Sequence, residues 1–138
     1  MRYGVFAVLF VSIFGCESVT VAQTWAPNPD GFAGPVVVLV SPHTQSAAEH
    51  LVLTLQAANR VIVVGNPSAG ANGNITGVLL PGAFGLTFTG LEVLQPDGST
   101  FHGVGVLPDL TVPLSAAALA NGTDPELDMA LAFMALDP

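Results

Sequence analysis

The sequence predicts an α/β fold, and three neighbouring segments carry that prediction. Residues 35–40 form an apolar, β-branched run of strand length between turn residues. Residues 44–58 have the spacing of an amphipathic helix, and residues 60–65 form a second short apolar run. If the helix is the crossover between the two runs, the two strands lie parallel in one sheet.

The predicted helix should bury one side against this sheet. Apolar residues recur along it at helical spacing, so one face is expected to point inward. The residues expected on that face are Ala47, Ala48, Leu51, Val52 and Leu55.

Alternation, turn residues and capping signals predict the other elements. Residues 17–25 alternate as a strand does, and residues 66–74 are too rich in glycine and asparagine for regular structure. Because open α/β folds place their sites in loops at the carboxyl ends of parallel strands, the 66–74 loop is expected near Ser46. Strands are also expected at 75–80, 85–89, 91–94 and 110–112, a hairpin turn at 96–98, a weak helix at 115–120, and a last helix from Pro125 to about residue 135, capped by Thr123 or Asp124.

Composition limits both the size of the fold and the partners it can bind. The 138 residues are enough for one domain but few for a covered two-layer enzyme. The net charge is −8 with two cationic residues, Arg2 and Arg60, and without lysine, which argues against nucleic acid and against an anionic membrane surface. Only 9% of the residues are charged, so the chain either associates with itself or a partner, or is a piece of something larger.

Metal ions and cofactors are not expected. Cys16 is the single cysteine, which excludes an intrachain disulfide and a cysteine-based zinc cluster. His43, Glu49 and His50 lie close in sequence, but no two histidines share a ligand spacing with a carboxylate on one element. We therefore predict no metal site and no cofactor.

The amino-terminal segment, residues 1–16, has two interpretations. Arg2, a continuous apolar run over residues 3–15 and Cys16 resemble a lipoprotein signal, although Phe14 is bulky for its place. This interpretation predicts a location in the cell envelope or outside the cell. Alternatively the run is a remnant helix of the domain, and the protein is cytoplasmic. Its dozen or so apolar residues are too few for a permanent membrane anchor.

Ser46 stands at the predicted corner between the first strand and the helix. A serine there brings its hydroxyl together with the first free N–H groups of the helix, as an acyl-transfer enzyme presents its nucleophile beside an oxyanion hole. Ser46 and Glu49 also match an S-x-x-E capping box, in which each side chain binds the other residue's backbone N–H. Spacing alone favours the cap, since caps are far commoner than nucleophiles.

Four blocks in order carry a resemblance to a known family: GPVVVLVSPHTQSAAE, RVIVVGNPSAG, GVGVLPDL and a terminal DPELDMALAFM helix. Together they resemble the carboxy-terminal half of the catalytic domain of the S41 serine peptidases, the tail-specific and tricorn-core-like proteases. The resemblance implies a ClpP/crotonase-like arrangement of ββα units and a single truncated domain over residues 17–138. It also implies that Ser46, three residues before Glu49, occupies the place of the nucleophile.

The sequence departs from the family at the position of the general base. Tail-specific members use a lysine close to the place of Ala71, and the absence of lysine excludes a Ser/Lys dyad. Tricorn-like members resemble a Ser–His system whose histidine lies upstream, in a region this chain lacks, with a glutamate at the place of His102. The upstream glycine-rich segment that helps to form the oxyanion hole is also absent.

Three histidines are the candidates for a base that works near neutral pH. His102 is favoured by the resemblance, His43 lies in the loop just before Ser46, and His50 is interpreted as a surface residue one turn along the helix. Asp97 or Asp109 could orient such a histidine, although backbone hydrogen bonding is the favoured role of Asp109. The Ala47 N–H is expected to stabilise an oxyanion, with Gly70 as a further loop contact.

Three functions remain open at this stage. The first is a serine hydrolase of S41 type that cleaves peptides or small esters through an acyl-enzyme on Ser46. The second is an inactive homologue that serves as a binding or interaction module. The third is a fragment whose site is completed by a second copy or another chain, which would also cover its apolar surface.

Overall fold

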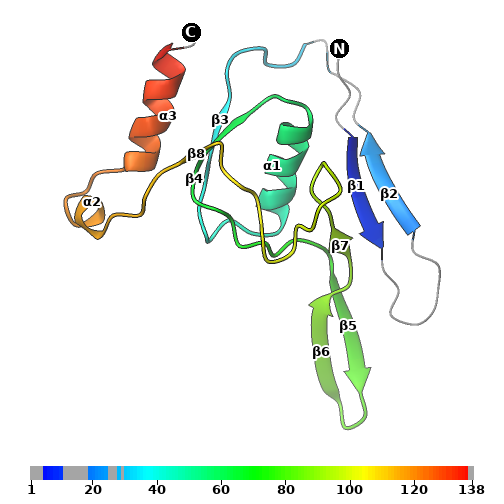
Figure 1. The fold of residues 1–138 in the computed structure, drawn as a ribbon. Coiled ribbons are helices and arrows are strands. Elements are labelled where there is room, and N and C mark those ends of the chain that lie inside the picture. The colour runs from blue at the N-terminus through cyan, green and yellow to red at the C-terminus, as the bar shows by residue number, and fades with distance from the viewer. Residues whose placement is uncertain (1–4, 11–18, 25–27, 29, 137–138) are drawn as a thin grey trace.

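The computed structural model describes residues 5–10, 19–24, 28 and 30–136, and Figure 1 shows their arrangement. Two neighbouring strands and one helix form the unit that the sequence predicts. Strand β3 (Val37–Val40) is followed by helix α1 (Ala47–Ala57) and strand β4 (Ile62–Gly65). Strands β3 and β4 pair in parallel, with Val37 beside Ile62 and Val40 beside Gly65. The parallel pairing predicted from the crossover helix is therefore confirmed.

A third strand completes this sheet. Strand β8 (Leu110–Thr111) pairs in parallel with β4, which gives the order β3-β4-β8. Helix α1 lies on one side of the sheet and helix α3 (Pro125–Leu136), which packs against β3 and β4, lies on the other (Figure 1). This layering makes the fold α/β. The core beneath α1 is formed by buried apolar side chains of six segments: Val40, Val52, Leu53, Val63, Val93, Phe101 and Val106.

The inner face of α1 differs from the prediction. Val52 is buried as expected, but Leu51 is 59% exposed, whereas Leu53 is fully buried. Ala47 and Ala48 are exposed too. Apolar residues occur on most sides of this helix, so periodicity alone did not orient it. The orientation observed also buries Glu49.

The amino-terminal part forms a separate antiparallel sheet. Strand β1 (Val5–Phe10) pairs with β2 (Val19–Thr24) and with β7 (Glu92–Val93), in the order β2-β1-β7. Where the structure describes the predicted remnant helix, at residues 5–10, the helix is corrected to a strand, which pairs with β2 on one side and β7 on the other. The other residues of the 1–16 segment lie outside the described residues. Cys16 lies outside the described residues, so the lipoprotein signal and the envelope location remain predictions.

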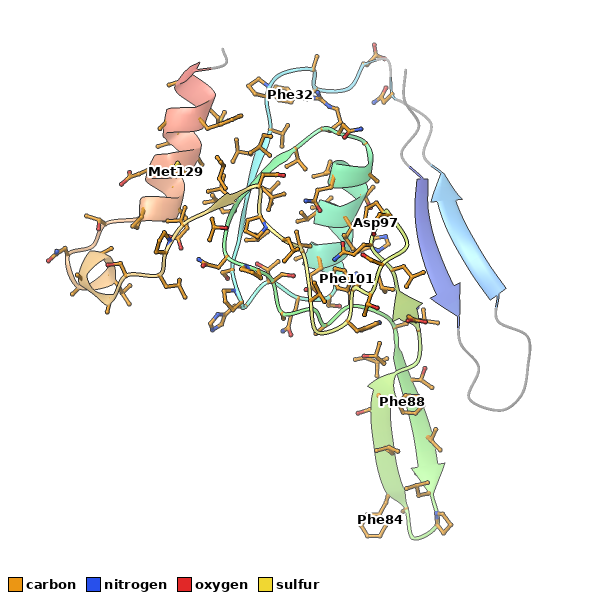
Figure 2. All side chains as sticks on the ribbon, in the orientation of Figure 1. Phe32, Phe84, Phe88, Asp97, Phe101 and Met129 are labelled. Carbon is orange, nitrogen blue, oxygen red and sulfur yellow. The ribbon has the colours of Figure 1, made fainter. Side chains whose placement is uncertain are left out.

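Strands β5 (Ile75–Leu80) and β6 (Phe84–Thr89) form a two-stranded antiparallel ribbon that projects from the body of the fold (Figure 1). Phe84 lies at its tip and Phe88 nearer the body (Figure 2). The cross-strand pairs Val78–Leu86 and Leu80–Phe84 place four apolar side chains on one face. Six large apolar side chains of the ribbon are exposed to solvent: Ile75, Val78, Leu79, Leu80, Phe84 and Leu86. A two-stranded ribbon of this kind is marginally stable without a partner.

Both carboxy-terminal helices begin with a side-chain cap, and the cap of the second was predicted from the sequence. Helix α2 (Ala116–Ala120) follows Ser115, whose Oγ accepts a hydrogen bond from Ala118 N–H (3.1 Å). Before α3, Asp124 Oδ1 accepts from Leu127 N–H (2.9 Å), so Asp124 caps this helix. Within the described residues, no helix combines the length and the apolar character that crossing a bilayer requires.

Candidate active site

Ser46 lies at the corner between β3 and α1 and has an unusual backbone conformation. Its φ of 57° and ψ of −124° lie outside the ordinary regions for a residue with a side chain, so the conformation must be held by its surroundings. The Ser46 N–H points to two acceptors, Ala71 O at 2.9 Å and Glu49 Oε2 at 3.0 Å. These contacts confirm that the 66–74 loop lies beside Ser46.

The Ser46 side chain is exposed. Ser46 and Glu49 are placed as in a capping box, and the bond from Ser46 N–H to Glu49 Oε2 forms one half of it. The hydroxyl, however, makes no cap hydrogen bond of full geometry. The Ser46 hydroxyl still faces the Glu49 N–H as in a capping box, so this half of the box is loosely formed, while the half that holds the Ser46 backbone is made.

Ala47 supplies the first N–H of helix α1. Within the described part of the chain this N–H has no acceptor, as expected for the first turn of a helix. It follows Ser46 directly and carries the positive end of the helix dipole. Of the two donors predicted for an oxyanion, this one is available.

Glu49 connects the beginning of the helix with the 66–74 loop. Its carboxylate is fully buried and accepts four hydrogen bonds. Oε1 accepts from Ser68 Oγ (2.5 Å) and Gly70 N–H (2.7 Å), while Oε2 accepts from Ser46 N–H (3.0 Å) and Ala71 N–H (3.2 Å). The sequence indicated Glu49 as half of a capping box. Its contacts with the loop could not be predicted, because the sequence does not show that its carboxylate is buried.

Gly70 lies at the centre of the loop but serves a structural purpose. Its N–H is taken by Glu49 and its carbonyl accepts from Gly103 N–H (3.0 Å). Its φ is +65°, and a Cβ here would lie 2.8–2.9 Å from the backbone nitrogens of Gly103, Val104 and Gly105. Only glycine permits this approach. Since the Gly70 N–H is occupied, an oxyanion would need a second donor other than this one.

His102 is half-buried, with its ring edge-on to Phe101. Its Nε2 accepts a hydrogen bond from Val93 N–H (3.0 Å). A neutral imidazole that accepts at Nε2 carries its proton at Nδ1, so no ring lone pair is left to take the serine proton. In the observed conformation His102 therefore ties the 101–105 segment to β7.

The other two histidines flank Ser46 in sequence. His43 is exposed, and its N–H donates to Ser41 Oγ (3.2 Å). Its ring makes no hydrogen bond to any other described residue. His50 is half-buried on α1, one turn beyond Ser46. The role of base remains a prediction for His43.

The two candidate orienting acids bind backbone or serine groups. Asp97 Oδ1 accepts from the Ser99 hydroxyl (2.7 Å) and N–H (2.9 Å) in the hairpin turn, and the Ser99 hydroxyl bond holds the pKa of Asp97 below its usual value. Asp109 Oδ2 accepts from Val63 N–H (2.8 Å). Both carboxylates thus have structural partners, as expected for Asp109.

Asn72 was not singled out from the sequence, yet it is 6% exposed within the loop beside Ser46. Its Oδ1 accepts from Gly73 N–H (2.8 Å), and its Nδ2 is buried and has no hydrogen-bond partner among the residues that the structure describes. Burying a donor without an acceptor costs free energy, so the other contacts of the loop must offset this cost.

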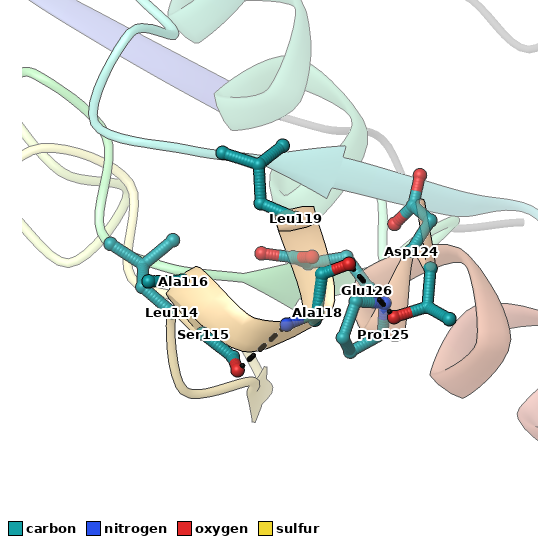
Figure 3. Close-up of a pocket in the computed structure, with 9 residues that line it drawn as sticks. Leu114, Ser115, Ala116, Ala118, Leu119, Asp124, Pro125 and Glu126 are labelled. Carbon is teal, nitrogen blue, oxygen red and sulfur yellow. Dashed lines mark hydrogen bonds between the residues drawn. The ribbon is translucent and has the colours of Figure 1, made fainter. Parts of the chain in front are cut away.

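The shallow pocket drawn in Figure 3 lies away from Ser46. It lies between α2 and the beginning of α3, and Leu114, Leu119 and Glu126 are among its lining residues. None of the candidate site residues lines it. Among the residues that the structure describes, no three histidine, cysteine or acidic side chains gather as metal ligands would.

Comparison with known proteins shows which family the chain belongs to. Residues 16–112 match the family model described as peptidase family S41. Two curated relatives from Chlamydia, one from C. trachomatis and one from C. muridarum, are 26% and 28% identical over 110 residues, which is 77% of this chain and 17% of each relative. This chain thus spans about a sixth of the length of the curated relatives that it matches.

Solved structures agree with this match. The photosystem II D1 C-terminal processing protease is 28% identical, with a TM-score of 0.61 over 81% of this chain and 28% of that chain. Mature CPAF is 26% identical, with a TM-score of 0.60 over 69% of this chain and 19% of that chain. A protein described as a candidate peptidase of Parabacteroides merdae has a TM-score of 0.77 over 94% of this chain and 42% of that chain, and at 20% identity it supports the fold alone. The resemblance carried by the four sequence blocks is confirmed, and this chain belongs to peptidase family S41.

Proposed function

We propose that this chain carries the nucleophile-bearing part of an S41-type serine peptidase site, with Ser46 as the attacking residue. The Ser46 oxygen adds to a peptide or ester carbonyl carbon while a base takes the hydroxyl proton, and the Ala47 N–H stabilises the developing oxyanion. The base then protonates the leaving amine or alcohol, which leaves an acyl-enzyme on Ser46. Water hydrolyses this intermediate and restores the serine.

One observation carries the proposal. Ser46 is an exposed residue at a strained backbone position, next to the N–H of Ala47, which has no acceptor among the described residues. An ordinary N-cap serine has an extended backbone, and its hydroxyl accepts a hydrogen bond from a backbone N–H in the first turn of the helix. Ser46 departs from that arrangement in its backbone angles, and its hydroxyl faces the Glu49 N–H as in a capping box without making a cap hydrogen bond of full geometry. A residue held for attack on a carbonyl is expected to have such a backbone.

The base is the missing component. The sequence has no lysine, and the acceptor nitrogen of His102 is bound to Val93 N–H. His43 is the residue of this chain that remains a candidate. Because the chain spans a small share of its relatives, we propose that a further polypeptide segment, in the same or another chain, supplies the base or its orienting acid. An open site favours small or activated esters, whose leaving groups need little protonation.

The exposed β5–β6 ribbon favours a second candidate function, a fragment or interaction module that needs another chain. Its six apolar residues are exposed side by side on one short ribbon, whereas exposed apolar residues on a protein surface are usually scattered singly. Such a surface is typical of a region covered by another polypeptide. This candidate and the first are compatible if the covering chain also completes the catalytic site.

The test measures the reactivity of Ser46 directly. Wild-type protein is incubated with a fluorophosphonate probe and with p-nitrophenyl acetate, with and without added imidazole as an external base. We expect covalent labelling and imidazole-dependent ester hydrolysis in wild type, and neither above background in Ser46→Ala. Ser99→Ala, which removes an exposed hydroxyl in the hairpin turn, is the control and should behave as wild type. Equal labelling of wild type and Ser46→Ala would overturn the assignment and leave the interaction module.

A further inference from the structure

We infer that Glu49 is a positioning residue whose buried carboxylate holds Ser46 in its reactive conformation. The inference rests on the proposed role of Ser46 and goes beyond it. It names Glu49 as the residue that maintains the unusual backbone conformation of Ser46, although Glu49 does not contact the bond being cleaved.

The two carboxylate oxygens have separate tasks. Oε1 binds Ser68 Oγ and Gly70 N–H, so it joins α1 to the first part of the loop. Oε2 binds Ser46 N–H and Ala71 N–H, so it joins the nucleophile to the second part. The Ala71 carbonyl also accepts from Ser46 N–H (2.9 Å). Ser46 is thus fixed both directly by Glu49 and through a residue that Glu49 fixes.

The held conformation competes with a more ordinary one. At an N-cap, a serine normally has an extended backbone, and its hydroxyl accepts from the N–H three residues ahead, here that of Glu49. Ser46 instead has a positive φ, and its hydroxyl, which faces the Glu49 N–H as in a capping box, makes no cap hydrogen bond of full geometry. Releasing the Ser46 N–H would let the residue relax to the extended cap. The nucleophile would then become a helix cap.

A carboxylate is required because all four neighbours of Glu49 are donors. Two oxygens with two acceptor positions each satisfy four donors without a competing proton. The amide of a glutamine would turn its NH₂ group either toward the N–H groups of Ser46 and Ala71 or toward the Gly70 N–H and the Ser68 hydroxyl, so at least one N–H group would lose its acceptor. Negative charge near the first turn of α1 is also favoured by the helix dipole.

The experiment compares Glu49→Gln with Ser68→Ala, a matched control. Ser68→Ala removes a bond on the Oε1 side and the acceptor of Val106 N–H (2.8 Å), but it leaves both contacts of Oε2. Urea unfolding gives the stability of each variant. Saturation kinetics of fluorophosphonate labelling give the maximal rate and the probe affinity for the folded protein.

We expect both variants to lose stability, while only Glu49→Gln loses maximal labelling rate, by at least about tenfold and with little change in probe affinity. A crystal structure of Glu49→Gln should show Ser46 with negative φ and its hydroxyl capping the helix. An unchanged labelling rate in folded Glu49→Gln, or an equal loss in Ser68→Ala, would overturn the inference.

Two further arms keep the result decisive. If Glu49→Gln does not fold, Glu49→Asp replaces it, because the shorter side chain keeps the charge but cannot reach both sets of donors. If wild type is not labelled at all, the proposed function fails. The inference about Glu49 is then judged by the Ser46 backbone angle alone, and a positive φ retained in the variant would refute it.

Discussion

Asp109 and Val63 are joined by a reciprocal pair of hydrogen bonds. Asp109 N–H donates to Val63 O (2.8 Å), and Asp109 Oδ2 accepts from Val63 N–H (2.8 Å). The pair fastens the entrance of β8 to the central strand β4. Asp109, one of the candidate orienting acids, therefore contributes to the sheet that supports the site.

Replacing Asp109 by alanine should destabilise the fold without altering Ser46 chemistry. The change leaves the N–H of the fully buried Val63 without its acceptor, which costs about 1–3 kcal/mol in the free energy of unfolding. Urea denaturation measures the loss. Asp30→Ala, at an exposed turn, is the control and should change little. A fall in Ser46 labelling of folded Asp109→Ala would instead support the orienting role.

Gly70 and Gly103 offer a test of the close approach beside the site. Both have positive φ, but a Cβ at Gly70 meets three backbone nitrogens within 2.9 Å, whereas a Cβ at Gly103 meets nothing within 4 Å. Gly103→Ala should cost about 1–2 kcal/mol for the backbone conformation alone. Gly70→Ala should cost about 1–3 kcal/mol more, because the loop must also move. Equal losses in thermal or urea unfolding would show that the loop adapts freely.

His102 is expected to stabilise the fold by accepting the hydrogen bond from Val93 N–H. His102→Phe keeps a ring beside Phe101 but removes the acceptor at Nε2, so the N–H of the buried Val93 loses its partner. We expect a loss of about 1–3 kcal/mol in unfolding free energy and an unchanged rate of Ser46 labelling. His43→Ala, at an exposed position, serves as the comparison for stability. If labelling disappears in folded His102→Phe, the histidine must leave Val93 and act as the base.

The hairpin turn should show a local pH dependence. The Ser99 hydroxyl and N–H hold the pKa of Asp97 below its usual value, so the ionised form is favoured in the folded state. A folded pKa below the unfolded value stabilises the turn at neutral pH, and this contribution fades as the pH falls below about 4. In an NMR titration, Ser99→Ala should raise the pKa of Asp97, while Thr100→Ala should not. An unchanged pKa in Ser99→Ala would remove the hydroxyl as the cause.

Local patterns in the sequence were sufficient for most elements of the fold. The apolar runs at 35–40 and 60–65 predicted β3 and β4, and the crossover helix predicted their parallel pairing, because these features depend on neighbours in the chain. The S-x-x-E spacing and the four sequence blocks likewise located Ser46 and indicated the S41 family. Asp124 and Ser115 began their helices as capping chemistry requires.

Long-range packing decided what these local patterns left open. Residues 5–10 were expected in a helix as one alternative, but they pair with β2 and β7, and strand partners cannot be read from an apolar run. The rotation of α1, which buries Leu53 and Glu49 and exposes Leu51, was set by the surfaces packed against the helix. The sequence alone thus determined the family, the order of the elements and the serine at the corner. Tertiary structure alone decided that Glu49 also binds Ser68, Gly70 and Ala71 and that Val93 occupies the nitrogen of His102, because these contacts join segments that only folding brings together.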